Sequence, residues 1–200
     1  MHPADGTGLG AVAVFCGSLP GHDPMFRAAA IALGALLAER RITLVYGGGR
    51  VGLMGAVADG ALEAGGQVIG VIPRGLVDRE LAHRGLADIR VTTSMHERKA
   101  TMAELSDAFI ALPGGAGTLD ELFEAWTWTM LGIHAKPCAL LDVAGFYGGL
   151  RDHVEHMVHT GFIDPGQVAG LLVDDDAGRL LDRLASWRPP APKWADGPPP

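Results

Sequence analysis

Cysteine and positive charge are both scarce in this 200-residue chain, which has two cysteines and only 16 lysines and arginines against 23 acidic residues. Cys16 and Cys138 each lie inside a short apolar, strand-like run, which favours buried, reduced thiols over a disulfide. The formal net charge of −7 argues against a duplex-binding surface, because neutralising phosphates requires clustered lysine and arginine. We therefore expect neither a disulfide scaffold nor a nucleic-acid partner.

Long apolar runs are missing as well. No stretch of about 18 apolar residues suggests a membrane span. The N-terminal sequence MHPADGTGLG lacks the basic region and apolar core of a signal peptide. We therefore expect a cytoplasmic protein with no membrane partner.

The chain is rich in apolar residues and glycine, with 48% hydrophobic residues and 29 glycines, enough for one domain with a substantial core. Strand-like runs alternate with helical patterns, which indicates an α/β fold with a doubly wound, mainly parallel sheet and helices on both faces. We expect one domain over residues 11–187, a flexible segment at 1–10 and a proline-rich disordered tail at 188–200. Strands are predicted at 11–16, 42–45, 67–72, 89–92, 107–112, 137–142 and 170–173, and helices at 24–40, 52–64, 94–106, 118–131, 146–160 and 177–187, with 73–87 mostly loop.

The most informative stretch is a strand that runs into a glycine-rich turn and then into a helix. The apolar run 107–112 is typical of a buried parallel strand. Gly114, Gly115 and Gly117 follow it, and glycine can take positive φ and leave backbone N–H groups uncovered. The start of a helix has unpaired N–H groups and a dipole that favours negative charge. This junction therefore predicts a phosphate site.

Thr118 and Glu121 allow two interpretations. If Thr118 opens the helix, Glu121 places a carboxylate one turn behind the phosphate site, as catalysis would require. The same T-x-x-E spacing also fits a capping box, in which both side chains only cap the helix. The spacing alone leaves both interpretations open.

A second glycine turn, from Gly47 to Gly49, follows the predicted strand 42–45. Ligands of open doubly wound sheets bind beyond the carboxyl ends of the strands, where both glycine turns lie, so we expect a single pocket. Neither turn matches G-x-G-x-x-G with an acidic residue about 20 positions later, so a nicotinamide dinucleotide is not predicted.

Arg98 and Lys99 are unusual for their position, because cations in the first turn of a helix oppose its dipole. An anionic ligand would compensate for this, and a surface ion pair with a nearby carboxylate is the alternative. At the start of the same helix, Ser94 and Glu97 have the spacing of a capping box. We assign Glu97 to that role.

Three histidines, His153, His156 and His159, recur at every third residue of a predicted helix. They lack the glutamate-histidine spacing of zincins, so we interpret them as one face of the helix and expect no metal site.

Four motifs, taken together, resemble the LOG family of cytokinin riboside 5'-monophosphate phosphoribohydrolases, long labelled "lysine decarboxylase". The segment PGGAGTLDE at 113–121 is similar to the family signature PGGxGTxxE, and MHERK at 95–99 is similar to M-H-x-R-K. YGGG at 46–49 with GLMG at 52–55, and ELAHRGL at 80–86, complete the set. The order and spacing match the family over roughly residues 11–185, which makes the resemblance specific.

The resemblance implies a Rossmann-like fold and hydrolysis of the N-glycosidic bond of N6-substituted adenosine 5'-monophosphates, and it leaves open whether AMP is also a substrate. The products are the free base and ribose 5-phosphate, and no cofactor is expected. Arg98 and Glu121 are the implied catalytic residues. A homodimer is also implied, although hexamers occur among relatives. The implied substrate contacts are Gly47, Gly48, Gly49, Glu80, Met95, Lys99, Gly114, Gly115, Ala116, Gly117, Thr118, Leu119, Asp120 and Thr127.

Two other functions fit the residues less well. A pyridoxal-phosphate lysine decarboxylase needs a lysine for the Schiff base, and the chain offers only Lys99, Lys136 and Lys193. A non-enzymatic carrier of a nucleotide or cofactor on the same fold would need the glycine turn but not the pair Arg98 and Glu121.

Overall fold

Seven strands form one sheet in the computed structural model, which describes residues 8–77 and 81–190. The strands are β1 (Ala11–Phe15), β2 (Thr43–Tyr46), β3 (Val68–Pro73), β4 (Asp88–Thr92), β5 (Ala108–Ala111), β6 (Cys138–Leu141) and β7 (Leu171–Asp174). Their order is β4-β3-β2-β1-β5-β6-β7, and every pairing between neighbouring strands is parallel. The chain therefore forms the strands from the centre of the sheet to one edge, from β1 to β4. It then returns to the centre at β5 and continues to the other edge at β7.

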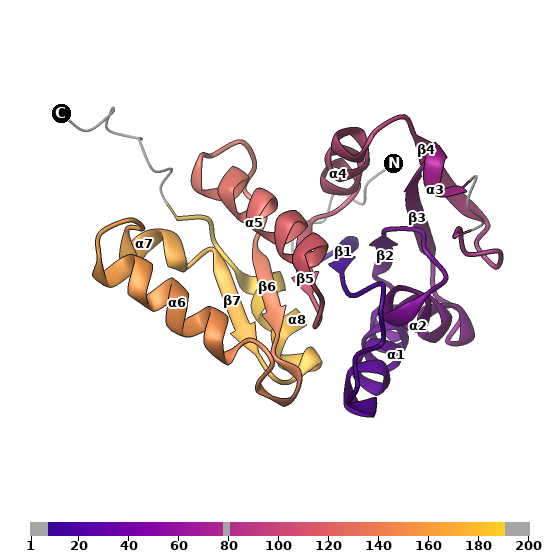
Figure 1. Cartoon of the computed structure of the whole chain (residues 1–200), viewed down its shortest axis with the longest axis horizontal. Coiled ribbons are helices and arrows are strands. Elements are labelled where there is room, and N and C mark those ends of the chain that lie inside the picture. Colours follow the sequence, from indigo (N-terminus) through magenta and orange to yellow (C-terminus); the bar gives the residue numbers. More distant parts are fainter. Residues whose placement is uncertain (1–7, 78–80, 191–200) are drawn as a thin grey trace.

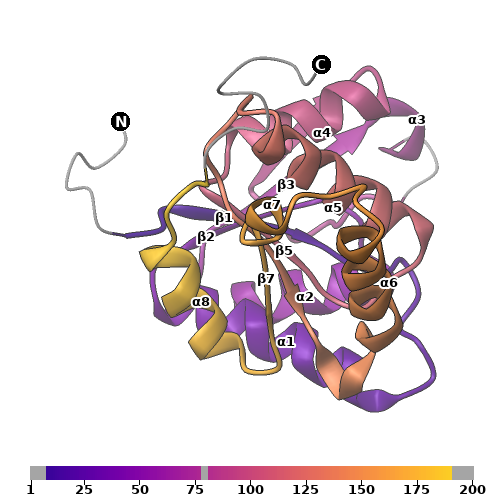
Figure 2. The ribbon, with the colours of Figure 1, turned by 90° about the vertical axis from the view of Figure 1, so that its left-hand side faces the viewer.

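Helices cover both faces of this sheet (Figures 1 and 2). They are α1 (Pro24–Glu39), α2 (Gly52–Glu63), α3 (Arg74–Val77), α4 (Met95–Glu104), α5 (Ala116–Met130), α6 (Gly148–His159), α7 (Pro165–Val168) and α8 (Ala177–Ser186), with a 3-10 turn at Val143–Gly145. Helices α1, α2 and α8 share a core with Val12 and Val14 of β1. Helices α4, α5 and α6 share a second core with Ala13 and Phe15, because successive strand residues point to opposite faces. This confirms the predicted α/β architecture.

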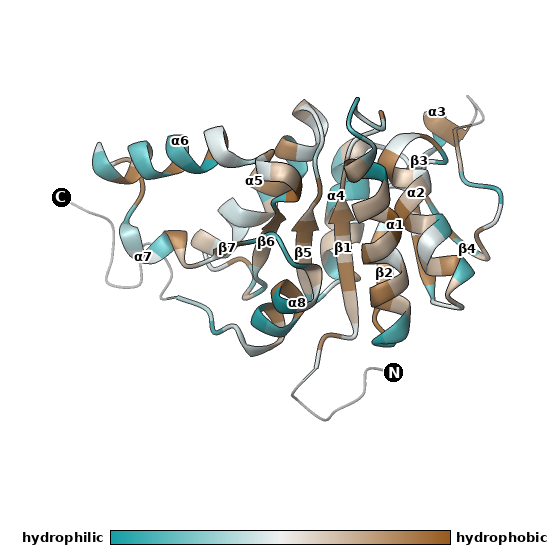
Figure 3. Cartoon of the chain, turned by 90° about the horizontal axis from the view of Figure 1, so that it is seen from below, coloured by the Kyte–Doolittle hydropathy of each residue, from teal (hydrophilic) through white to brown (hydrophobic). Residues whose placement is uncertain are grey.

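The strands β1, β5 and β6 consist of apolar residues, whereas α6 carries mainly hydrophilic residues (Figure 3). All five residues of β1 are buried, as expected for a parallel strand covered on both faces. Cys16 and Cys138 are buried free thiols, as predicted. Within the described residues, no helix is long and apolar enough to cross a membrane.

The sequence pattern missed two short helices. α3 lies in the segment 73–87, expected to be mostly loop, and α7 lies between the predicted helix 146–160 and the predicted strand 170–173. Each is four residues long, too short to show a helical period of apolar residues. The predictions for residues 1–7, for the tail from 191 onward and for Glu80 fall outside the described residues.

The order of the strands reverses between β1 and β5. These two strands pair in parallel, from Val12 with Ala108 to Phe15 with Ala111. Beyond the carboxyl ends of these strands, Gly17 N donates to Pro113 O at 3.1 Å. The two loops at the reversal point are thus held together, at the place where open α/β sheets bind ligands.

Candidate functional site

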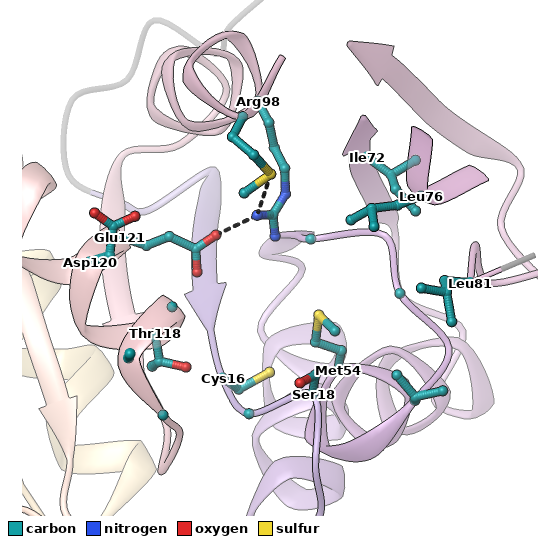
Figure 4. Close-up of a pocket in the computed structure, with 18 of the residues that line it drawn as sticks. Cys16, Ser18, Met54, Ile72, Leu76, Leu81, Arg98, Thr118, Asp120 and Glu121 are labelled. Atoms are coloured by element: carbon teal, nitrogen blue, oxygen red, sulfur yellow. Dashed lines mark hydrogen bonds and ion pairs between the residues drawn. The ribbon is translucent and has the colours of Figure 1, made fainter. Parts of the chain in front are cut away.

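A cavity of about 450 Å³ lies beyond the carboxyl ends of β1, β2, β3 and β5. Small-molecule sites span roughly 300–1,000 Å³, so the cavity has a suitable size. The start of α5 forms one side, and apolar side chains from α2, β3 and α3 form the opposite side (Figure 4). The charged side chains Arg98 and Glu121 lie between these two sides. The two predicted glycine turns therefore contribute to a single pocket, as expected.

The start of α5 presents unpaired backbone N–H groups to the cavity. The helix begins at Ala116 with Gly115 as its N-cap, and no side chain caps it. Ala116, Gly117 and Thr118 line the cavity, and within the described part of the chain their amides have no hydrogen-bond acceptor. Together with the helix dipole, these three amides form a suitable site for a phosphate.

Thr118 does not cap α5, so the capping-box interpretation is wrong. The predicted start of the helix was Thr118, but the helix begins at Ala116, so Thr118 lies inside it. No side chain, that of Thr118 included, makes a capping hydrogen bond at the start of α5. The carboxylate of Glu121 instead contacts Arg98.

The second predicted capping box, at the start of α4, is confirmed in part. Ser94 is the N-cap, and its Oγ accepts a hydrogen bond from Glu97 N at 3.1 Å. Glu97 Oε2 accepts from the backbone N and from Oγ1 of Thr93, both at 2.6 Å, rather than from the backbone of Ser94. Glu97 therefore caps an exposed helix end.

Arg98 and Glu121 form a buried ion pair between α4 and α5. Arg98 Nη1 lies 2.7 Å from Glu121 Oε1, and each side chain is only 9% exposed. The contact is short but lacks hydrogen-bond geometry, so Oε1 has no hydrogen-bond donor among the described residues. Arg98 Nε donates to Val71 O at 3.1 Å, which fixes the guanidinium against β3. Both side chains line the cavity, so the pair is available to a ligand.

Burial raises the pKa of the Glu121 carboxyl above its ordinary value of 4.5, although neighbouring Arg98 acts in the opposite direction. The desolvation of the carboxylate thus outweighs its attraction to the guanidinium. Carboxyl groups with raised pKa values in clefts are frequent acid or base catalysts.

Lys99 does not line the cavity. Its Nζ lies 3.1 Å from Asp120 Oδ2 and 3.0 Å from Glu124 Oε2, both on α5. Burial lowers the pKa of Lys99, but the hydrogen bonds that its ammonium donates to Glu124 and Asp120 outweigh this and raise it. For Lys99, the arrangement is therefore the ion pair that the sequence left as an alternative.

The glycine turn after β2 is required by Arg98. A Cβ at Gly47 would collide with the guanidinium and lie 3.2 Å from Met54 Sδ, so any side chain there would displace Arg98. Gly48 has φ +70, a conformation that favours glycine. Gly47 and Gly49 line the cavity.

Gly114, Gly115 and Gly117 do not use the positive φ that glycine allows. Gly114 is constrained by space, because a Cβ there would lie 2.7 Å from Thr118 Cβ and 2.9 Å from Gly17 N. Apart from the adjoining backbone, no atom of the described residues lies within 4 Å of a Cβ placed at Gly115 or Gly117. These two glycines leave the cavity side of the helix start open to a ligand.

The structure gathers most of the predicted residues around one cavity. Leu119 and Thr127 instead line a separate, shallow cavity on α5, and Gly114 lies behind the phosphate site. Glu80 is outside the described residues. The predicted residues that line the cavity are Gly47, Gly49, Met95, Arg98, Gly115, Ala116, Gly117, Thr118, Asp120 and Glu121.

Two parts of the cavity were not predicted. One is the end of β1, where Cys16, Gly17 and Ser18 line it, and the position of β1 beside β5 at the reversal point could have revealed it. Burial raises the pKa of the Cys16 thiol, which keeps it neutral. The other part is the apolar wall, and no local sequence signal marks it. It consists of Val51, Met54, Ile72, Leu76 and Leu81.

The histidines of α6 do not gather around a metal. The rings of His153 and His156 are 6.4 Å apart, and both residues are exposed. Over residues 8–77 and 81–190, no group of three or more histidine, cysteine, aspartate or glutamate side chains has the arrangement of a metal site.

The sequence is similar to curated enzymes over most of its length. A probable cytokinin riboside 5'-monophosphate phosphoribohydrolase of Oryza sativa subsp. japonica is 49% identical, covering 90% of this chain and 73% of the relative. A cytokinin riboside 5'-monophosphate phosphoribohydrolase of Rhodococcoides fascians is 48% identical, covering 88% of this chain and 89% of the relative.

The fold is similar to that of a molybdenum cofactor binding protein of Rippkaea orientalis, with a TM-score of 0.67 and 22% identity over 88% of this chain and 95% of the other. At this identity the likeness concerns the fold alone. A family model described as "Possible lysine decarboxylase" matches residues 54–184. Together with the curated relatives, this match shows that the chain belongs to the LOG family, for which "lysine decarboxylase" is the older label.

Proposed function

We propose that this protein hydrolyses the N-glycosidic bond of adenosine 5'-monophosphates, including those with an N6 substituent, to the free base and ribose 5-phosphate. The observation that carries the proposal is the buried pair Arg98–Glu121 beside three unpaired helix amides. The names of the curated relatives support the same reaction and substrate class.

The shape of the cavity supports one orientation of the substrate. The 5'-phosphate binds the amides of residues 116–118, because these are unpaired donors at a helix start. The base lies against the apolar wall across the cavity, where Met54, Ile72 and Leu81 suit an aromatic ring and an apolar N6 group. The ribose then lies between the phosphate and the base, next to Glu121.

Cleavage of the glycosidic bond creates positive charge on the ribosyl carbon, as in glycoside hydrolysis. The Glu121 carboxylate stabilises this charge or activates the attacking water by taking its proton. Arg98 limits the rise in the pKa of Glu121 and offers a guanidinium to ribose or phosphate oxygens. Binding energy from the phosphate orients the reacting carbon, which predicts that monophosphates react faster than nucleosides.

A carrier of a nucleotide or cofactor is the alternative, and it would use the helix amides without needing a buried acid. The Arg98–Glu121 pair favours the enzyme, because a desolvated carboxylate beside a ligand site contributes nothing to simple anion binding. The older label of the family is not supported by the lysines. Lys99 and Lys136 do not line the cavity, and Lys193 lies outside the described residues.

We further propose a homodimer that forms through the exposed side of α5. A shallow cavity there is lined in part by Leu119, Phe123 and Trp128, and Leu131 at the end of the helix is exposed. Sedimentation velocity should give the mass of a dimer. A cytoplasmic location, expected from the N-terminal sequence, belongs to the same proposal and is tested by cell fractionation.

The decisive experiment measures products. Purified protein is incubated with AMP, isopentenyl-AMP and the two corresponding nucleosides, and free base and ribose 5-phosphate are quantified by chromatography. We expect product from the monophosphates, with kcat/KM at least about 100-fold above that of the nucleosides. Tight binding of the monophosphates without any product would instead indicate the carrier.

A further inference from the structure

The motif ELAHRGL contributes a segment that crosses the glycine turn after β2. Gly49 and Ala82 form an isolated antiparallel bridge. On either side of it, Arg50 N donates to Leu81 O and His83 N donates to Gly48 O, both at 2.9 Å. This pairing places Leu81 at the edge of the cavity, where its side chain forms part of the apolar wall (Figure 4).

The ring of His83 joins this segment to α2 on the outside of the cavity. His83 Nε2 lies 3.0 Å from Asp59 Oδ1 on α2, and Nδ1 accepts a hydrogen bond from Gly85 N at 3.1 Å. Because Nδ1 accepts, the ring proton of the neutral imidazole is on Nε2 and is donated to Asp59. The His83 side chain is 11% exposed and that of Asp59 is 48% exposed. Both ring nitrogens of His83 are therefore used to fix the segment that carries Leu81.

We infer that His83 is a positioning residue that sets the apolar, base-binding side of the cavity by holding Leu81 in place. This inference rests on the proposed nucleotide hydrolysis. Leu81 N also donates to Leu76 O at 3.2 Å, so two residues of the apolar wall are linked to each other and, through His83, to α2. His83 does not line the cavity, so its effect reaches the substrate through Leu81.

Different elements hold the two halves of the cavity. The phosphate half is built on α5, and the pair Arg98–Glu121 is held by α4, α5 and β3. None of these elements contacts the His83 ring through a hydrogen bond. Loss of the ring contact should therefore weaken binding of the base and its N6 group while leaving phosphate binding and the chemical step intact.

The test compares His83→Ala with wild type on isopentenyl-AMP, and measures inhibition by inorganic phosphate in the same assay. We expect KM to rise by about tenfold, as for loss of one well-placed contact, with kcat within roughly twofold and the Ki of inorganic phosphate unchanged. Asp59→Ala removes the partner of the ring from the half-exposed side of α2 and should give the same pattern even if His83→Ala folds poorly. His159→Ala, an exposed histidine on α6, is the matched control and should change nothing.

Three results would overturn the inference. An unchanged KM in both variants would show that the ring does not position the wall. A parallel change in KM, kcat and the Ki of inorganic phosphate would show a general structural role. Additive effects of His83→Ala and Asp59→Ala, when both are combined in one protein, would show that His83 and Asp59 act separately. Absence of product with the wild-type protein would instead count against the proposed function, so the two failures are distinct.

Discussion

Replacing Glu121 by glutamine removes one negative charge and little volume, so it isolates the role of the carboxylate. In the proposed reaction this charge faces the developing positive charge on the ribosyl carbon. Loss of one such transition-state contact lowers kcat by about 10²–10³-fold, equivalent to about 2.7–4 kcal/mol. KM for AMP should stay within a few-fold, because the phosphate is held by the amides of residues 116–118.

The stability of the variant tests the electrostatics of the same group. Removing one partner of a buried ion pair usually destabilises a protein by about 3–5 kcal/mol. Here burial raises the pKa of Glu121, so the folded protein favours the neutral form of this carboxyl more than the unfolded chain does. Such a group contributes stability below its unfolded-state pKa and loses that contribution as pH rises through the folded-state pKa. Glutamine imitates the neutral form, and Arg98 keeps its bond to Val71 O. At neutral pH we therefore expect Glu121→Gln to melt no lower than wild type.

The assay measures kcat and KM for AMP together with the melting temperature, using Glu97→Gln as the matched control. Glu97 is the acid that caps α4 from an exposed position, and its replacement should leave kcat unchanged. If Glu121→Gln kept full turnover and melted at a lower temperature, Glu121 would be a structural residue and the catalytic assignment would be refuted.

The pH dependence of the wild-type rate follows from the same shift. If the ionised carboxylate is the active form, kcat falls as pH drops through the raised pKa of Glu121, so the acidic limb lies above pH 4.5. This limb should disappear from the residual activity of Glu121→Gln. A limb that persisted in the variant would belong to another group.

Three further substitutions probe the supports of the site. Tyr147→Phe removes the hydroxyl that donates to Leu112 O at 2.6 Å, just before the phosphate turn, and should raise KM for AMP several-fold and lower the melting temperature. Tyr46→Phe is its control, because the buried Tyr46 hydroxyl has no hydrogen-bond partner within the described residues, so KM should not rise and the melting temperature should not fall. Arg98→Ala should abolish turnover while its circular dichroism spectrum stays native. A misfolded variant would leave the role of Arg98 unsupported. Gly115→Ala places a methyl group in open space at the phosphate site, so it should raise KM for AMP with an unchanged melting temperature, whereas an unchanged KM would exclude phosphate from this position.

The sequence was sufficient to predict the long elements, because each leaves a local signal. Asp23 before Pro24 marked the start of α1, and Asp23 Oδ1 does accept from Met25 N at 2.8 Å. The start of α5 was misplaced because Gly115 caps it with backbone alone, whereas Thr118 offered a hydroxyl at a plausible but incorrect position. A cap without a side chain leaves no trace in the residue types.

The contacts within the site were harder to predict than its location. The two glycine turns marked the correct edge of the sheet, because strand ends and glycines are both local features. That Arg98 meets Glu121 depends on the packing of α4 beside α5, and that His83 meets Asp59 depends on a segment returning to α2. Neither contact has a fixed spacing along the chain, so the residues were found by resemblance and their partners only in the structure.

The position of the Arg98–Glu121 pair argues for a role in chemistry rather than in folding. The pair joins α4 to α5, and apolar side chains of similar volume would join the same helices without desolvating two charges. Its carboxyl has a raised pKa, so the ionised form is less stable here than in water. The ionised carboxylate lies on the wall of a cavity, next to unpaired helix amides. This charged form becomes favourable only when a ligand brings a compensating charge. In the proposed reaction that compensation arises at the ribosyl carbon, in the transition state, where it accelerates the reaction.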